Sequence, residues 1–190
     1  MTRTGSIVLA LVLGASSMSV AEIKAVGGGT CPFNVNGTLG PGDLTESPRL
    51  FRADPPSDCA APQPCDGPSG TGPYFYDQYT FVNGGATNCV TVSITSNCAA
   101  PGTFSIHTSA YLNAFTPGSA TICTDFLGDI GNSPADGDPP KSYSFDVPPG
   151  QTFVVVVNHI TVGGTCPAPG YDLTVTGCEV PVTLQDFTIQ

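Results

Sequence analysis

The stretch SYSFDVPPGQTFVVVVN, residues 142–158, decides the fold class of this chain. Apolar and polar side chains alternate over residues 143–147, which is the period of a half-buried β-strand. Residues 148–150 then place proline and glycine at the inner positions of a type II turn, so the two halves of the stretch are expected to form a hairpin. Residues 153–157 are apolar at every position, which predicts a central strand covered on both faces or one at a sheet junction.

The same pattern extends outward along the chain. Gly, Pro, Asn and Asp interrupt it about every ten residues, with Thr, Val, Phe and Tyr between them and no helical period. Strands are predicted at nine places: residues 33–39, 75–82, 89–95, 103–112, 122–126, 142–147, 152–158, 171–176 and 181–189. So many strands exceed one open layer, and the predicted fold class is therefore all-β, a β-sandwich of about nine strands.

Two stretches do not fit this strand pattern. Residues 40–72 are rich in Pro, Gly, Asp and Ser, and residues 128–141 form a shorter acidic connection. Long loops in a compact domain are usually either functional or poorly ordered. Both stretches are therefore places to look for a site.

The first 21 residues have the pattern of a secretory signal peptide. Arg3 is followed by an apolar run over residues 7–13, and Ser19 and Ala21 fit the small-x-small cleavage pattern. The run is short for a membrane span, which disfavours the alternative of an N-terminal anchor. We expect residues 1–21 to be removed, residues 22–179 to form one domain, and residues 180–190 to be a C-terminal strand or tail of a secreted or cell-surface protein.

Acidic side chains dominate the charge. The chain has 15 acidic and five basic residues and a formal net charge of −10, which becomes −11 when Arg3 is lost with the signal peptide. Such a surface disfavours binding to nucleic acid or anionic lipid. We therefore expect no nucleic-acid partner and no membrane insertion after signal cleavage.

The eight cysteines all follow the expected cleavage point, and an even number in an exported chain predicts four disulfides. They are Cys31, Cys59, Cys65, Cys89, Cys98, Cys123, Cys166 and Cys178. A short proline-containing spacer favours a local Cys59–Cys65 bridge, and the outer pair favours Cys31–Cys178. For the other four, pairing of 89 with 166 and of 98 with 123 is the weaker expectation. Zinc is the competing interpretation, but no Cys-x-x-Cys motif occurs.

Several strand and turn motifs occur in a characteristic order. They are Asp77-x-Tyr79-x-Phe81, Val90-Thr91-Val92, Val147-Pro148-x-Gly150 and Tyr171-x-Leu173-x-Val175. This order resembles the bacterial pre-peptidase C-terminal domain over about residues 33–177, with the cysteines and residues 40–72 suggesting a cysteine-rich, stand-alone member. The resemblance implies a jelly-roll-like β-sandwich, an accessory module of exported proteins that in some members binds calcium or a matrix polymer.

The acidic connection supplies a candidate calcium site. Its oxygen-bearing side chains are Asp125, Asp129, Asn132, Asp136 and Asp138. Carboxylate and amide oxygens are ligands that Ca²⁺ prefers, although their spacing is not that of an EF-hand. The alternative is an ordinary solvated acidic loop.

Two tyrosines form a candidate ligand platform. Tyr74 and Tyr76 share the strand face opposite Phe75 and Tyr79, so both rings are expected to point outward, where they could contact a polymer. The alternative is a pair of half-buried tyrosines with solvated hydroxyls.

No motif for catalysis is found. His107 and His159 are the only side chains of near-neutral pKa, neither belongs to a known nucleophile motif, and the cysteines are expected to be in disulfides. We therefore expect a non-catalytic binding or accessory module that recognises an extracellular protein or polysaccharide, stabilised by calcium. The alternative hypothesis is a structural subunit of a surface assembly that associates through its C-terminal strand.

Overall fold

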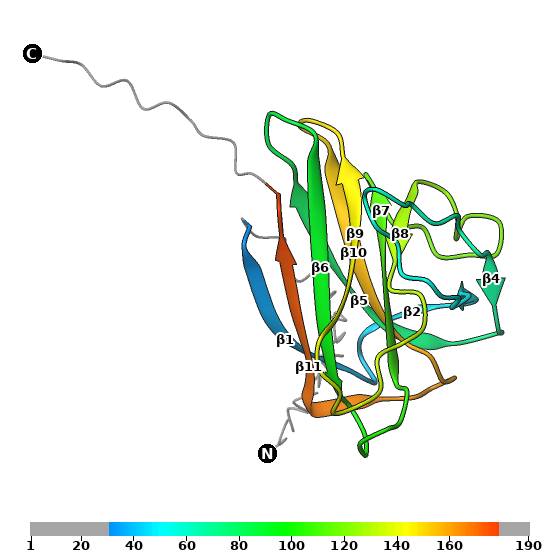
Figure 1. The fold of residues 1–190 in the computed structure, drawn as a ribbon. Coiled ribbons are helices and arrows are strands. Elements are labelled where there is room, and N and C mark those ends of the chain that lie inside the picture. Colours follow the sequence, from blue (N-terminus) through cyan, green and yellow to red (C-terminus); the bar gives the residue numbers. More distant parts are fainter. Residues whose placement is uncertain (1–30, 179–190) are drawn as a thin grey trace, which may run out of the picture.

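The computed structural model describes residues 31–178, which form a sandwich of two antiparallel β-sheets (Figure 1). The first sheet contains, in spatial order, β1 (Phe33–Leu39), β11 (Cys166–Thr176), β6 (Asn88–Asn97) and β9 (Lys141–Val147). The second contains β2 (Leu44–Glu46), β5 (Tyr74–Val82), β10 (Thr152–His159), β7 (Ile106–Leu112) and β8 (Phe126–Asp129). A separate ribbon is formed by β3 (Arg49–Leu50) and β4 (Pro68–Ser69). The predicted all-β class is confirmed.

The pairing of the strands is that of a jelly roll. Once β2, β3 and β4 of the segment 40–72 are set aside, eight strands remain. The first of these pairs with the last (β1 with β11), the second with the seventh (β5 with β10), the third with the sixth (β6 with β9) and the fourth with the fifth (β7 with β8), always antiparallel. A long antiparallel hairpin rolled into two sheets has this nested order, so the jelly-roll-like sandwich is confirmed.

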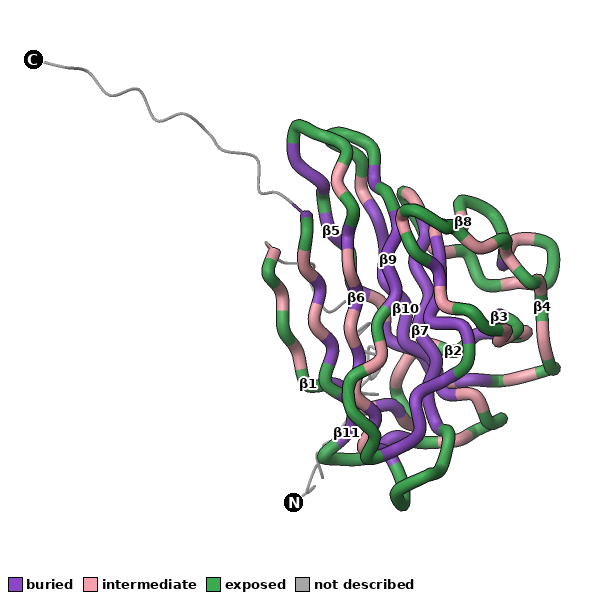
Figure 2. Tube along the Cα trace, viewed as in Figure 1, coloured by how far each residue is buried: buried purple, intermediate pink, exposed green. Residues whose placement is uncertain are grey.

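The valine-rich strand β10 is buried on both faces, as predicted, because it lies between β5 and β7 and carries packing on each side (Figure 2). Phe153, Val155 and Val157 belong to the main core between the two sheets. Val154 and Val156 face the other way, into a second apolar cluster. The second sheet therefore has no solvated face along this strand.

The outer face of the second sheet is covered by two connections. Phe115, from the connection between β7 and β8, packs on Tyr76 and Tyr111 with ring centroids 5.3 and 4.8 Å apart. The segment 40–72 contributes Ser57, whose N–H donates to the carbonyl of Asp129 in β8 and whose carbonyl accepts from β9. This segment thus ties together the edges of the two sheets.

Some strand predictions were wrong in detail. Residues 122–124 lie in a series of turns, in which the N–H of Ile122 donates to Gly118, and β8 begins only at Phe126. The strand predicted from residue 103 begins at Ile106, and the segment 40–72 contains three short strands. The expected signal peptide and the C-terminal strand over 181–189 lie outside the described residues. No apolar helix of membrane-spanning length occurs in residues 31–178.

All eight cysteines form disulfides, but most of the predicted pairs were wrong. Cys31–Cys178 is confirmed, whereas the others are Cys59–Cys89, Cys65–Cys123 and Cys98–Cys166. The predicted Cys59–Cys65 bridge, and the 89–166 and 98–123 pairs, do not form. The reason is tertiary: the segment 40–72 lies against the sandwich, so each of its cysteines bonds to the strand or turn beside it.

Candidate functional site

An open hollow of about 260 Å³ lies at one end of the second sheet and is lined by Arg52, Phe104 and Asn132. Phe104 lies just before β7 and Asn132 just after β8, and these ends are adjacent because the two strands are antiparallel. Arg52 comes from the segment 40–72, and its Nη1 donates to Ser133 Oγ at 3.0 Å. We call this feature the Phe104 hollow.

One exposed apolar side chain, Phe104, lines the hollow. Phe104 is 53% exposed, and the loops beside it carry Phe51 and Val162, which are 48% and 54% exposed. Two hydrogen bonds join these loops: the N–H of Ile160 donates to the carbonyl of Ser105, and the side-chain Nε of Arg49 donates to the carbonyl of Ile160. Among the described residues only Val82, at the end of β5, is a further large exposed hydrophobic side chain. Phe104 therefore supplies an exposed aromatic ring at the wall of the hollow.

The polar edge of the hollow is held by a hydrogen-bonded group. The backbone N–H and the side-chain amide of Asn132 both donate to the carboxylate of Asp54. Lys141 Nζ donates to the carbonyl of Asn132 at 2.6 Å and lies 3.5 Å from Asp54 Oδ1. The hydrogen bonds from Asn132, and then Lys141, lower the pKa of Asp54, so this carboxylate is ionised and paired.

The described chain has three basic residues, and all of them lower the pKa of one buried histidine, His107. They therefore lie around this end of the sandwich. Burial, and then the charges of Arg52, Arg49 and Lys141, lower the pKa of His107 to about 3. Lys141 is paired with Asp54, but within residues 31–178 neither Arg49 nor Arg52 has a carboxylate oxygen within 4.0 Å. A strongly acidic protein thus carries two uncompensated guanidinium groups at one place.

Behind the hollow, the outer face of the second sheet carries a layer of buried polar side chains. His107 and Asp129 lie 4.0 Å apart between Nε2 and Oδ1, and neither ring nitrogen of His107 makes a hydrogen bond of ordinary geometry. Glu46 Oε1 and the Tyr111 hydroxyl likewise have no partner. Burial raises the pKa of Glu46 to about 8, partly opposed by Arg49, and raises that of Asp129 to about 7, partly opposed by the backbone of Gly131. Near pH 7 Glu46 is therefore largely neutral and does not cancel the guanidinium charges.

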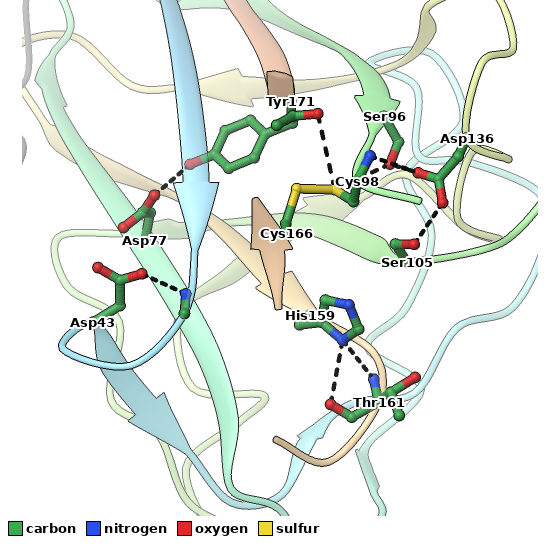
Figure 3. The surroundings of a disulfide bond; sticks show 12 residues. Asp43, Asp77, Ser96, Cys98, Ser105, Asp136, His159, Thr161, Cys166 and Tyr171 are labelled. Carbon is green, nitrogen blue, oxygen red and sulfur yellow. Dashed lines mark hydrogen bonds between the residues drawn. A yellow bond between two sulfur atoms is a disulfide. The ribbon is translucent and has the colours of Figure 1, made fainter. Parts of the chain in front are cut away.

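The five residues of the candidate calcium site are not brought together as one ligand set. Asp125 and Asp138 are exposed, and Asn132 is bonded to Asp54. Asp129 and Asp136 are buried, and Asp136 accepts hydrogen bonds from Ser96, Ser105 and the N–H of Cys98 (Figure 3). Within residues 31–178 one trio of potential ligands lies within 4.8 Å, namely Cys59, Cys89 and Asp146, and its two cysteines form a disulfide. Calcium binding stays a prediction of the sequence.

The prediction that Tyr74 and Tyr76 point outward was wrong. Tyr74 and Tyr76 do share the outer face of the second sheet, but they are only 4% and 6% exposed. Tyr76 packs under Phe115, and the guanidinium of Arg49 lies over the ring of Tyr74 at 5.6 Å. The alternation of side chains along β5 is as predicted, but the face expected to be exposed to solvent is covered by the segment 40–72 and by the connection between β7 and β8.

Neither histidine is placed for acid–base chemistry on a bound substrate. His107 has no exposed surface. His159 Nδ1 accepts a hydrogen bond from the backbone N–H of Thr161 (Figure 3), and burial lowers its pKa. Every cysteine is in a disulfide, so none supplies a thiolate nucleophile.

Sequence reasoning missed the Phe104 hollow entirely. Arg52 and Phe104 belong to no motif. Arg52 lies in the irregular segment 40–72, and Phe104 was assigned to the strand predicted over residues 103–112, which begins only at Ile106. One signal was available: a chain with only five basic residues has two of them, Arg49 and Arg52, three positions apart in its longest irregular segment.

A second hollow of similar size lies beside β9 and is lined mainly by Ser57, Asp58 and Ser144 with Tyr143. Its polar groups bond one another, because Ser144 Oγ donates to Asp58 and accepts from the N–H of Cys59. The polar side chains of this second hollow are therefore engaged with one another.

No protein-family model and no curated protein matches this chain. The expected membership of the pre-peptidase C-terminal family is thus not confirmed. Among solved structures, the chain is similar to the K3 cleaved adhesin domain of Lys-gingipain from Porphyromonas gingivalis, with 12% identity over 64% of this chain and 69% of that one. The TM-score of 0.27 is too low for this likeness to carry any conclusion about function.

Proposed function

We propose that this protein is a secreted, non-catalytic binding module that recognises an extracellular protein or polysaccharide through the end of the sandwich that carries the Phe104 hollow. One observation carries the proposal: an uncompensated arginine borders an open hollow beside an exposed aromatic ring. Arginine and aromatic side chains are both typical of recognition sites.

The rigidity of the surrounding loops supports a binding role. The segment that supplies Arg52 is held by the Cys59–Cys89 and Cys65–Cys123 disulfides, one to β6 and one to the turns before β8. Asn132 is held by three hydrogen bonds to Asp54 and Lys141. A site held in place before the ligand arrives loses less conformational entropy on binding.

The disulfides and the acidic charge support the location. Four disulfides in a domain of this size are typical of an exported protein, because reducing compartments keep thiols free. A net charge of −10 disfavours partners such as nucleic acid and anionic lipid. The candidate partners are therefore the proteins and polysaccharides found outside the cell.

The test is binding of the purified protein to arrays of purified polysaccharides and purified extracellular proteins. We expect retention on at least one of them, loss of that retention in Phe104→Ala, and no loss in Val82→Ala. Val82 is a matched control because it is also 53% exposed but lies at the end of β5. Retention on no surface, or equal retention of the two variants, would contradict the proposal.

A further inference from the structure

The charge of the Phe104 hollow indicates what kind of ligand it accepts. Arg52 donates from Nη1 to Ser133 Oγ, and no carboxylate of the described chain lies within 4.0 Å of its guanidinium. A guanidinium carries five N–H donors in a planar fork that matches a carboxylate. Donors therefore remain at the wall of the hollow for an anionic group.

The acids near the hollow do not compensate this charge. Asp54 is already shared between Lys141 and Asn132, and Glu46 and Asp129 are buried beneath the loops. Arg49 and Arg52 are thus two cationic groups with no carboxylate oxygen of the described chain within 4.0 Å, although the net charge of the whole chain is −10. A ligand with isolated carboxylates is favoured over a dense polyanion, which the rest of the surface would repel.

The remaining walls fit a sugar ring. The exposed face of Phe104 can pack on the apolar face of a pyranose. The side-chain N–H of Asn132 is committed to Asp54, which leaves its Oδ1 as an acceptor for a hydroxyl. Planar polar groups held in fixed positions beside one ring are well suited to hydroxyl-rich ligands.

The size of the site favours one residue of a polymer. At about 260 Å³ the hollow is at or below the small end of sites that enclose a whole ligand, roughly 300–1,000 Å³. A protein partner would instead need a buried apolar centre within an interface of more than about 1,000 Å². The described chain exposes only four large hydrophobic side chains, one of them at a distant strand end, which is too few for such a centre.

We propose, building on the function above, that the Phe104 hollow binds a carboxylate-bearing sugar residue of an extracellular polysaccharide, with Arg52 pairing to the carboxylate and Phe104 packing on the ring. Asn132 positions a sugar hydroxyl. Arg52 thereby determines specificity for acidic over neutral glycans.

The test uses calorimetric titration with three acidic probes, namely tri-galacturonate, tri-mannuronate and 3′-sialyllactose, each paired with its methyl ester. We expect at least one acid to bind and its ester to bind about tenfold or more weakly, since a hydrogen bond to a charged group is lost. Arg52→Gln should weaken binding of the acid by a similar factor and leave binding of the ester unchanged. The affinity of Arg52→Lys for the acid should lie between those of the wild type and Arg52→Gln. Thr80→Glu is the matched control, because it lowers the net charge by the same amount at an exposed position of β5.

The outcomes separate this inference from the proposed function. Equal binding of acid and ester, or an unchanged affinity in Arg52→Gln, overturns the role of Arg52 and leaves a glycan-binding module. Binding of an acidic hexapeptide as tightly as the best sugar overturns the sugar assignment. If no acidic probe binds while the array shows Phe104-dependent retention, the inference fails and the proposed function stands; if the array also shows nothing, both fail.

Discussion

Replacing Glu46 with glutamine tests the charge state of the buried polar layer behind the hollow. Glu46 is 3% exposed, and its Oε1 has no hydrogen-bond partner. Burial raises its pKa from 4.5 to about 8, although Arg49 acts in the opposite direction. Glutamine keeps the shape of the side chain and removes the titration.

The size of the effect follows from proton linkage. Between pH 4.5 and 8 the folded protein holds a proton on Glu46 that the unfolded chain has released. Raising the pH through this window therefore favours unfolding, and the stabilisation from this group is fully present only below pH 4.5. At about 1.4 kcal/mol per pKa unit the loss is at most about 5 kcal/mol, and we expect about 2–5 kcal/mol.

The assay is urea unfolding of the wild type and Glu46→Gln at several pH values between 5 and 9. The free energy of unfolding of the wild type should fall more steeply with pH than that of the variant. Asp129, whose pKa is raised to about 7, contributes to the slope of both proteins, so their difference isolates Glu46. Asp138→Asn, at an exposed position, is the control and should follow the wild type. Parallel curves for the wild type and Glu46→Gln would contradict a raised pKa of Glu46.

Three further predictions concern the scaffold and are checked by chemical denaturation. Gly37→Ala should cost about 1–3 kcal/mol, because its Cβ would lie 2.1 Å from Cζ of Tyr171, whereas Gly85→Ala, with nothing within 4 Å, should change stability by less than about 0.5 kcal/mol. Tyr171→Phe removes the hydroxyl that donates at 2.6 Å to a buried carboxylate of β5 (Figure 3). The expected loss of stability is about 1.5–3 kcal/mol, and an unchanged stability would contradict this prediction. Replacing Cys59 and Cys89 together by serine opens a disulfide of sequence separation 30, with an expected loss of about 3–4 kcal/mol, and peptide mapping of the wild type should recover this pair.

The strands could be predicted because their signals are local. The fully apolar run over 153–157 is buried at every position, as expected. The period of two over residues 143–147 also holds, except at Ser144, which is buried because the segment 40–72 lies against it. Ile122 shows the limit of such signals: it is buried, but as an anchor within a series of turns rather than in a strand. A single apolar position does not distinguish the two.

The disulfides and the site could not be predicted from local signals. Cys59 and Cys65 are close in sequence, yet each bonds to a residue 30 or more positions away. Tyr74 and Tyr76 were expected at the surface because alternation assigns a strand face, and alternation does not show whether another segment covers that face. Arg52 and Phe104 come together only because the ends of β7 and β8 meet beneath the segment 40–72.

Local signals are sufficient to predict an all-β, disulfide-bonded sandwich with an acidic surface, because hydrophobic period, turn residues, cysteine number and charge are properties of the chain. Three features follow from the packing of the folded chain: the disulfide partners, the burial of the outer face of the second sheet, and the position of Arg52 beside Phe104. Each of these depends on contacts between residues distant in sequence. The long segment over residues 40–72, which has the weakest strand pattern in the described chain, makes most of those contacts.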